Sequence, residues 1–280
     1  MMKTVFKNAV SGLWPSVKSL GKILFQSRKC VFTARAEAEK IIIMGNGPSL
    51  RRFIVNNAEM LASIPSMAVN FAANAPEFIS LRPEYYLMAD PHFFTGADDP
   101  NVKRLYERLV EIDWPLTVFV PVKYYSVTRE RLRANTLITV NSFNFVGIEG
   151  WDWLKDMAYR SGTGMPRPRN VLIPSIMTAV RMGFKEIILV GADHSWTQTL
   201  SVDEANRVVS VQPHFYKDNN AEKERVSSVY SNIKLHELLL SFHIAFKSYW
   251  EVRRYADKIG IQIKNATPGS FIDAFERAQL

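Results

Sequence analysis

Short apolar runs alternate with helical patterns along most of the chain, and this alternation predicts an α/β fold. Four consecutive apolar residues occupy positions 41–44, and further strand candidates are residues 67–70, 85–89, 116–120, 137–140, 186–191 and 261–264. Apolar residues at helical spacing lie between them, most clearly over 102–112 and 171–182. Continuously apolar strands separated by helices are typical of a mostly parallel sheet with helices on both faces.

The first of these strands leads into a tight turn of sequence Gly45-Asn46-Gly47-Pro48-Ser49. A buried strand, a glycine turn and a helix in this order are typical of a Rossmann-like nucleotide-binding domain. Pro48 suits a first helical turn, and the unpaired N–H groups of a helix start suit a phosphate. Because the third glycine of the dinucleotide fingerprint is missing, the turn alone is weak evidence for a nucleotide.

Polar residues follow four of the predicted strands. They are the turn at 45–49, then Asn70, then Asp90 with His92, and finally Asp193 with His194. Ligands of open α/β folds bind beyond the carboxyl ends of the strands. We therefore expect these four clusters to gather at one edge of the sheet and to form a single ligand site.

The pattern changes after residue 196. Residues 197–221 show no clear period, and a helical run follows over 222–258. An irregular stretch of this length inside a compact domain is usually functional or disordered, and we interpret it as a lid. The predicted organisation is an N-terminal segment over 1–39, a Rossmann-like nucleotide-binding domain over 40–196 and 260–280, and a lid with a long helical region over 197–259.

The net charge of +8 is distributed unevenly along the chain. Residues 1–40 contain eight basic and two acidic side chains, whereas the other 240 residues contain 27 and 25. The nearly neutral body therefore gives no reason to expect a nucleic acid partner. An apolar fraction of 47% is sufficient for a full core, which excludes a disordered or fibrous protein. The single Cys30 cannot form an internal disulfide, which fits a reducing compartment.

The N-terminal segment carries an apolar and a cationic stripe at helical spacing. The apolar stripe consists of Phe6, Val10, Leu13, Val17, Leu20 and Leu24, and the cationic stripe consists of Lys3, Lys7, Lys18 and Lys22. Pro15 and Gly21 leave open whether one helix or two short ones form. The segment either lies on an anionic membrane surface, with Trp14 and Phe25 as anchors, or packs on the domain, or forms a basic tail. No run reaches the roughly 20 apolar residues of a spanning helix. We expect a cytoplasmic protein, with peripheral binding at the inner membrane face as one option.

Few ionisable residues are candidates for chemistry. His214, between aromatic residues of the predicted lid, is the candidate general base, because imidazole titrates near neutral pH. His236 and His243 fit packing or surface positions, whereas His194 follows a strand end where it could meet a ligand.

A metal site is not expected, because the two Asp and His pairs at the strand ends supply only two ligands each. The acidic pair at 98–99 lies between Gly96 and Pro100 and is explained by a turn. Residues 161–164, flanked by Arg160, Arg167 and Arg169, are either a phosphate-binding loop or a solvated linker.

Four segments resemble, in order and spacing, the family 42 bacterial sialyltransferases. They are Ile-Ile-Met-Gly-Asn-Gly-Pro-Ser-Leu at 42–50, Val-Asn-Phe at 69–71, Met-Ala-Asp-Pro-His-Phe-Phe at 88–94 and Met-Gly-Phe-Lys-Glu-Ile-Ile-Leu-Val-Gly-Ala-Asp at 182–193. The resemblance covers about residues 40–275. It extends to a broader group that includes motility accessory factors and the archaeal 6-hydroxymethylpterin pyrophosphokinase.

The resemblance implies a metal-independent glycosyltransferase that transfers sialic acid or a related sugar from a CMP-sugar, with inversion, to a cell-surface glycan or glycolipid. His214, Asp193 and Tyr216 would be catalytic. His214 aligns with the base of that family across a small gap, and without the gap Asp218 stands there. Residues that would bind the nucleotide are Gly45, Asn46, Gly47, Pro48, Ser49, Asn70, Asp90, Asn170, Gly191 and Asp193.

Two alternatives stay open. The same glycine turn fits an ATP-dependent, pyrophosphokinase-like enzyme, which would be expected to use Mg²⁺ with Asp90 and Asp193 as ligands. Ser195 replaces a tyrosine of the sialyltransferases, and together with the shifted His214 this fits a non-catalytic, membrane-associated scaffold of the same fold. The donor sugar, the acceptor, the linkage and the oligomeric state are left open by the sequence.

Overall fold

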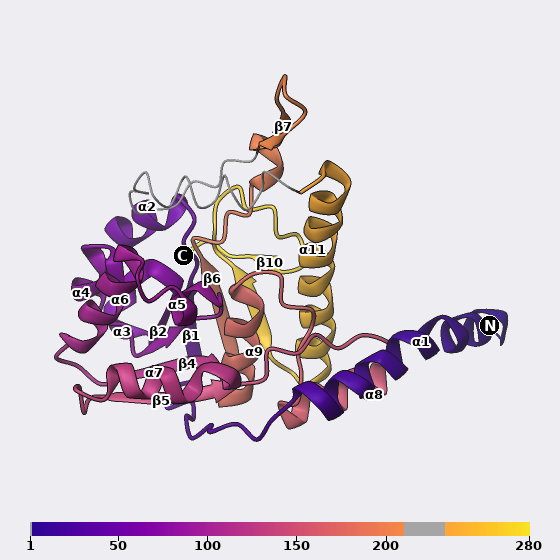
Figure 1. Ribbon diagram of the computed structural model, residues 1–280, viewed down its shortest axis with the longest axis horizontal. Helices are drawn as coiled ribbons and strands as arrows, with labels where there is room; N and C mark the ends of the chain where they lie inside the picture. The colour runs from indigo at the N-terminus through magenta and orange to yellow at the C-terminus, as the bar shows by residue number, and fades with distance from the viewer. Residues whose placement is uncertain (1, 210–232) are drawn as a thin grey trace.

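The computed structural model describes residues 2–209 and 233–280, with residues 2–10 described by their backbone alone (Figure 1). Eight strands form one sheet in the order β10-β9-β6-β1-β2-β3-β4-β5, and every neighbouring pair is parallel. The strands are β1 (Lys40–Met44), β2 (Ser66–Val69), β3 (Tyr85–Leu87), β4 (Leu116–Pro121), β5 (Ile138–Phe143), β6 (Glu186–Val190), β9 (Gln262–Asn265) and β10 (Glu276–Arg277). A small antiparallel hairpin, β7 (Ser201–Val202) with β8 (Val208–Val209), lies outside the sheet.

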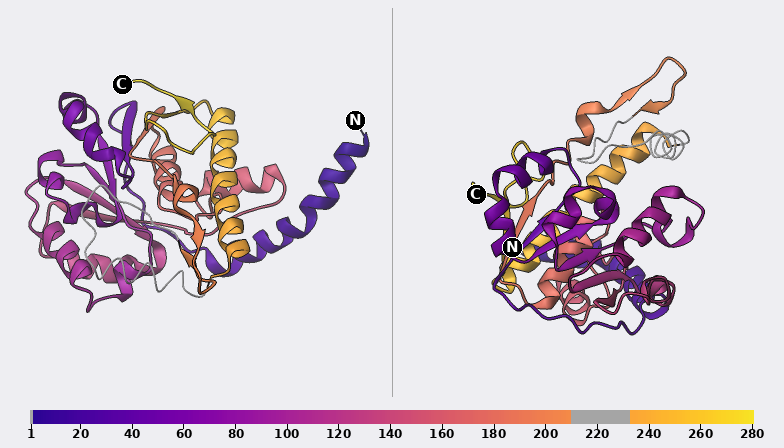
Figure 2. Two further views of the ribbon diagram at one scale, coloured as in Figure 1. Left: turned by 90° about the horizontal axis from the view of Figure 1, so that it is seen from above. Right: turned by 90° about the vertical axis from the view of Figure 1, so that its left-hand side faces the viewer.

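Helices cover both faces of the sheet (Figure 2). One face carries α8 (Asp152–Ser161), α9 (Leu172–Met182) and α11 (Leu235–Lys258). The other face carries α2 (Ser49–Asn56), α3 (Ala58–Ser63), α4 (Glu77–Leu81), α5 (His92–Thr95), α6 (Pro100–Val110) and α7 (Tyr125–Leu132). Short 3-10 helices are η1 (Asn70–Asn74), η2 (Val122–Tyr124) and η3 (Trp196–Thr199).

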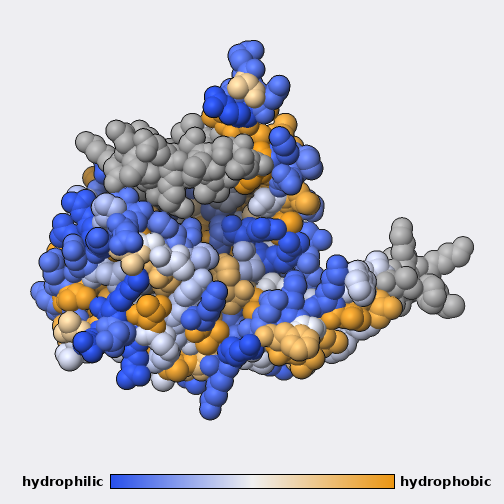
Figure 3. Space-filling model, in the orientation of Figure 1, coloured by the Kyte–Doolittle hydropathy of each residue, from blue (hydrophilic) through white to orange (hydrophobic). Residues whose placement is uncertain are grey.

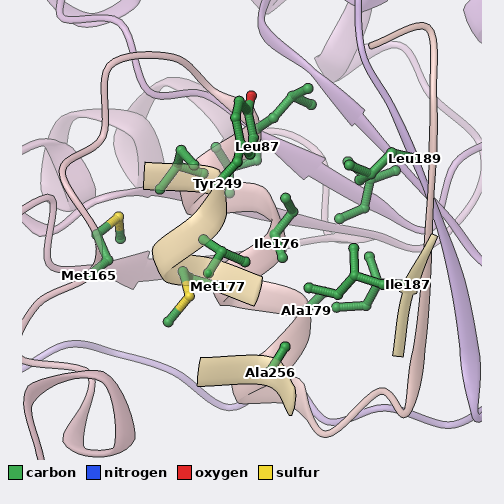
Figure 4. Packing of buried hydrophobic residues seen from close by; sticks show 14 of the residues in the cluster. Leu87, Met165, Ile176, Met177, Ala179, Ile187, Leu189, Tyr249 and Ala256 are labelled. Carbon is green, nitrogen blue, oxygen red and sulfur yellow. The ribbon is translucent and has the colours of Figure 1, made fainter. Parts of the chain in front are cut away.

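Alternate strand residues enter two separate cores, which explains why the strands are continuously apolar. Ile41 and Ile43 of β1 pack on the side of α9 and α11, whereas Ile42 and Met44 pack on the side of α2 to α7. Figure 4 shows part of the first core, where side chains of α9 and α11 pack with Ile187 and Leu189 of β6. Full burial of one such side chain contributes about 1.5–3 kcal/mol. The predicted α/β class with a mostly parallel, Rossmann-like sheet is confirmed.

Strand β10 and helix α8 are among the elements that the sequence pattern did not predict, and they escaped it for different reasons. Strand β10 has only two residues, both exposed, so it has no apolar signal. Helix α8 inverts the usual pattern, because Trp153 and Met157 are exposed while Lys155 and Asp156 are buried. The buried charges are paired, since Asp156 lies 2.6 Å from Arg254 of α11 and Lys155 lies 2.7 Å from a carboxylate of the same helix.

The N-terminal segment forms one continuous helix, α1 (Met2–Gln26), with Pro15 inside it. The chain after α1 runs along the edge strand β5. The Asn144 side chain accepts a hydrogen bond from the Arg28 N–H at 2.8 Å, and the Ser142 N–H donates to the Val31 carbonyl at 2.6 Å. This segment covers the backbone of an edge strand that would otherwise be open to pairing with other chains.

Helix α11, which the sequence groups with the lid, packs on α9 and β9. Its residues Tyr249, Val252 and Tyr255 lie in the same core as β1 and β6. The helix is therefore a structural layer of the sheet domain. Of the irregular segment 197–221 that the sequence predicts as a lid, residues 197–209 are described and contain most of η3 and the β7–β8 hairpin. Residues 210–221 lie outside the described residues, so the lid itself stays a prediction.

Candidate functional site

The candidate site lies where the strand order reverses. From β1 the sheet continues through β2 to β5 on one side and through β6 to β10 on the other. The carboxyl ends of β1 and β6 therefore flank a topological switch point, which is the usual ligand position in open α/β sheets. All four predicted polar clusters follow the carboxyl ends of β1, β2, β3 and β6, which are adjacent strands.

Two glycine-containing loops touch at this point. The Gly45 N–H donates to the Val190 carbonyl at 2.8 Å, and the Gly47 N–H donates to the Gly191 carbonyl at 2.8 Å. A Cβ on Gly45 would lie 2.5 Å from the Gly191 carbonyl oxygen, and a Cβ on Gly47 would lie 1.9 Å from Asp193 Oδ2. The two glycines of the turn are thus required by the close approach of the β6 loop.

Asp193 lies at the start of helix α2. Its Oδ2 accepts a hydrogen bond from Ser49 Oγ at 2.8 Å, and the carboxylate also accepts from the Ser49 N–H. Burial raises the pKa of Asp193, and the hydrogen bonds from Ser49 act in the opposite direction. The carboxylate thus occupies the helix start where the sequence predicts a phosphate, and a phosphate bound there would lie beside a negative charge.

Two asparagines of the site carry buried acceptors. Asn46 Nδ2 donates to the Val69 carbonyl at 3.1 Å, which fixes the amide and identifies Oδ1 as the acceptor. Asn46 Oδ1 and Asn70 Oδ1 have no hydrogen-bond partner among residues 2–209 and 233–280. Leaving a buried acceptor unpaired costs about 1–3 kcal/mol. Both atoms would therefore favour a ligand that donates hydrogen bonds.

The backbone at Asn70 is left-handed, with a φ of 52°. The buried Tyr86 hydroxyl holds it there, because this hydroxyl donates to the Asn70 carbonyl and accepts from the Ala73 N–H at 3.1 Å. Asparagine tolerates this conformation better than most residues, but glycine tolerates it best.

Asp90 and His92 mainly hold the loop after β3. Asp90 Oδ1 accepts from the His92 N–H at 2.9 Å, and His92 Nε2 lies 2.8 Å from Asp99 Oδ2. Asp99 in turn caps α6 by accepting from the Asn101 N–H at 2.7 Å. Burial acts to raise the pKa of Asp99, but the hydrogen bonds from His92 and Asn101 outweigh it and lower the pKa. A role of Asp90 toward a ligand stays a prediction.

A chain of three hydrogen-bonded side chains adjoins Asp193. His194 Nε2 lies 2.7 Å from the Tyr249 hydroxyl, which lies 2.9 Å from Asn170 Oδ1. Asn170 Oδ1 also accepts from the N–H groups of Leu172 at 3.0 Å and Ile173 at 3.4 Å, which fixes the amide as the cap of α9. Because this oxygen only accepts, the Tyr249 proton points to it, and His194 Nε2 carries the proton that completes the chain.

The unprotonated nitrogen of His194 is therefore Nδ1. Burial lowers the pKa of His194 to about 3, so the ring is neutral at physiological pH. The residue has a left-handed φ of 52°, and its ring lies 4.1 Å from the ring of Trp196. The sequence placed His194 at the site, but it contained no signal for Tyr249, which is 55 residues further along the chain.

The arginines around residues 161–164 do not form one cationic loop. Gly162 ends α8 with a φ of 68°, and its carbonyl accepts from Asn144 Nδ2 at 2.9 Å. Arg167 lies 3.6 Å from Glu149, whereas Arg169 is exposed directly before Asn170. Residues 161–164 are thus a packed helix end.

The C-terminal segment supports the β6 loop, which the sequence did not indicate. Thr267 Oγ1 accepts from the Ala192 N–H at 3.0 Å, and Ser270 Oγ donates to the Ala192 carbonyl at 2.6 Å. The Phe271 N–H donates to the Asp193 carbonyl at 2.9 Å. Isolated Thr and Ser residues after a short strand produce no periodic pattern, so only the tertiary structure identifies these contacts.

The predicted catalytic residues His214 and Tyr216 lie outside the described residues. His236 and His243 are exposed on α11, as expected for surface positions. Within residues 2–209 and 233–280, no three or more His, Cys, Asp or Glu side chains are grouped so that they could hold a metal ion. In the same part of the chain, no helix has the length and apolar character needed to cross a membrane.

Together these features define an α/β protein with a candidate ligand site at the switch point of a parallel sheet. No family model matches the chain, and no curated protein matches its sequence. A solved structure of similar fold is the MAf glycosyltransferase from Magnetospirillum magneticum AMB-1, with a TM-score of 0.51 and 12% sequence identity. The match covers 90% of this chain and 35% of that chain, so this chain spans about a third of that protein's length. At this identity the likeness concerns the fold alone.

Proposed function

We propose that this chain is a sialyltransferase-like glycosyltransferase, which transfers sialic acid or a related sugar from a CMP-sugar to a cell-surface glycan or lipid-linked acceptor. The observation that carries the proposal is a pair of buried acceptors beside the switch point, Asn46 Oδ1 and Asn70 Oδ1, which have no hydrogen-bond partner in the described part of the chain. A cytidine offers the donors that complement them, namely ribose hydroxyls and an exocyclic amino group. The fold of the MAf glycosyltransferase supports the same broad class.

The charge at the start of α2 favours a CMP-sugar over ATP. Asp193 already accepts both the Oγ–H and the N–H of Ser49. A CMP-sialic acid carries one charge on its phosphodiester and one on the carboxylate of its sugar, whereas ATP concentrates several negative charges on adjacent phosphates and would need cations beside the Asp193 carboxylate. In the proposed complex Asp193 accepts a hydrogen bond from a ribose hydroxyl, and the donor phosphate lies toward Arg169.

The proposed reaction is a single displacement with inversion. The acceptor hydroxyl attacks the anomeric carbon, the bond from that carbon to the phosphate oxygen breaks, and a base takes the hydroxyl proton. His214 is the proposed base, and Tyr216 is proposed as a further catalytic residue. The neutral His194, with its unprotonated Nδ1, is a second candidate for that role.

Thermal-shift measurements with CMP and with ATP, each with and without Mg²⁺, test the proposal. We expect CMP to raise the Tm without Mg²⁺, since a ligand at a hundred times its Kd adds about 2.7 kcal/mol to the free energy of unfolding. A shift by ATP only with Mg²⁺ would support the pyrophosphokinase-like alternative instead. No shift with either nucleotide would contradict both.

The variant Asn70→Gly tests the observation that carries the proposal. Glycine keeps the left-handed backbone at this position, so the amide is removed without strain. We expect CMP to bind about three- to tenfold more weakly, while the Tm of the free protein stays the same or rises. The control Asn206→Gly makes the same change at another left-handed asparagine, with a φ of 57°, in the exposed β7–β8 hairpin. Equal losses in both variants would remove Asn70 from the site.

A further inference from the structure

Helix α1 docks on the body mainly through serine side chains, with Ile23 partly buried beside them. Among residues 11–26 of the helix, the buried side chains are Ser16 and Ser19, which are 0% and 1% exposed, whereas Leu24 and Phe25 are 74% and 77% exposed. A helix held only by its own domain is expected to bury its apolar stripe. The outer face of α1 consists of Leu13, Trp14, Val17, Leu20, Leu24 and Phe25, all of them exposed.

The docked face is specific, which fixes the direction of the outer face. Ser16 Oγ accepts from the Trp151 N–H at 2.9 Å, and Ser19 Oγ both accepts from the Glu149 N–H at 2.9 Å and donates to the Glu149 carbonyl at 2.8 Å. A Cβ on Gly150 would lie 2.2 Å from Ser16 Oγ, so the two backbones approach too closely for larger side chains. A rotation of the helix that buried the apolar stripe would break these hydrogen bonds.

We propose that the outer face of α1 binds an anionic lipid surface. Figure 3 shows apolar side chains along the lower edge of the arm that α1 forms. Trp14 is 65% exposed and lies beside Lys18, whose Nζ is 5.0 Å from the centre of the Trp14 ring. Aromatic and basic side chains side by side at the border of an apolar stripe suit the headgroup region, where apolar and charged groups are both solvated.

Charge favours lipid over a second copy of this chain as the occupant. Helix α1 contains no acidic residue, and Arg28 and Lys29 follow it directly and are exposed. Pairing two such helices would bring like charges together, whereas an anionic surface complements them. The arm stands out from the body in two perpendicular views, so a flat surface can reach it (Figure 1; Figure 2).

Vesicle flotation with the full chain tests this proposal. We expect binding to vesicles of phosphatidylcholine mixed with phosphatidylglycerol, little binding to phosphatidylcholine alone, and weaker binding as salt rises. Leu24→Ser should weaken binding at least about tenfold, because the variant loses the free energy that the parent gains when the leucine side chain moves from water into the lipid. Lys18→Gln should weaken it about fivefold.

The matched control is Val55→Ser on α2, where the side chain is 75% exposed but lies outside α1. Its binding and its Tm should equal those of the parent, and Leu24→Ser should also keep the parent Tm. Equal losses for Leu24→Ser and Val55→Ser, or no binding to the mixed vesicles, would overturn the proposal. Sedimentation velocity without vesicles tests whether a second copy of this chain covers the outer face of α1 instead. A concentration-dependent dimer that Leu24→Ser abolishes, in a protein that does not bind the mixed vesicles, would identify that second copy as the partner. Binding of CMP does not enter this test.

Discussion

At the scale of single residues, protonation separates the two candidate bases. His194 is held neutral by burial, which lowers its pKa to about 3, and its Nε2 proton is engaged with Tyr249. A histidine that keeps an ordinary pKa of about 6.5 would instead gain a proton in mildly acidic solution and cease to act as a base. The two residues therefore predict different pH dependences for the same reaction.

We expect the rate of sugar transfer, measured as kcat/KM, to fall in mildly acidic solution, because His214 is the proposed base and a histidine acts as a base only while its ring is unprotonated. In His214→Ala this decrease of kcat/KM at low pH should be absent, and the rate of transfer should be lowered by about two to four orders of magnitude. His236→Ala removes an exposed histidine of α11 and should preserve both the rate of transfer and its decrease at low pH. A parent profile that stays flat down to about pH 4 would assign the base to His194.

At the scale of elements, helical periodicity identifies a helix but does not decide which face it docks. The sequence pattern of α1 predicts a helix with an apolar stripe, and the helix is present. The side chains that its residues 11–26 bury, however, are those of Ser16 and Ser19. Helix α8 likewise buries Lys155 and Asp156. In both helices the polar side chains have specific partners in segments distant in the chain, and the sequence pattern does not contain those partners.

The start of α9 provides a prediction at this scale. Asn170→Ala removes the acceptor of two helix N–H groups and of the Tyr249 hydroxyl, so we expect the free energy of unfolding to fall by about 1–2 kcal/mol. Asn170→Asp keeps an oxygen in place and should lose less. Urea unfolding at neutral pH measures both, and a larger loss for the Asp variant would show that the cap is not the source of the stability.

At the scale of the whole molecule, an ion-pair network joins α8 to α11. Asp156 lies 2.6 Å from Arg254 and 2.6 Å from Lys258, and its side chain is 8% exposed. Burial acts to raise the pKa of Asp156, but the hydrogen bonds from Arg254 and Lys258 outweigh it and lower the pKa. Since the folded pKa lies below the unfolded one, the stabilisation is complete above the unfolded value of about 4 and is lost as the pH falls through the folded value.

We therefore expect Asp156→Asn to lower the free energy of unfolding by about 1–3 kcal/mol at pH 7. The difference from the parent should shrink as the pH falls below about 4, because the carboxyl becomes protonated first in the unfolded parent and, at lower pH, in the folded parent. Asp113→Asn breaks the exposed pair with Arg82 and should change stability by less than about 1 kcal/mol. Chemical unfolding at both pH values provides the comparison, and a difference that persists unchanged in acid would exclude the ion pairs as its cause.

Most of the strands, and the sheet edge at which the polar clusters lie, were predicted from the sequence alone, whereas the order of the strands came from the tertiary structure. Ile41, Ile42 and Ile43 require cover on both faces, and parallel strands place their carboxyl ends at one edge. Gly45 and Gly47 marked the turn beside that edge, but only the tertiary structure showed that the loop of Asp193 is what requires them.

Tertiary structure also decided the proton on His194, because the Asn170 cap and the Tyr249 hydroxyl come from distant segments. It decided as well the outward apolar face of α1, because Ser16 and Ser19 find their partners in residues 149–151. Periodicity reports which residues share a face. Contacts between distant segments, each worth about 1 kcal/mol, decide where that face points.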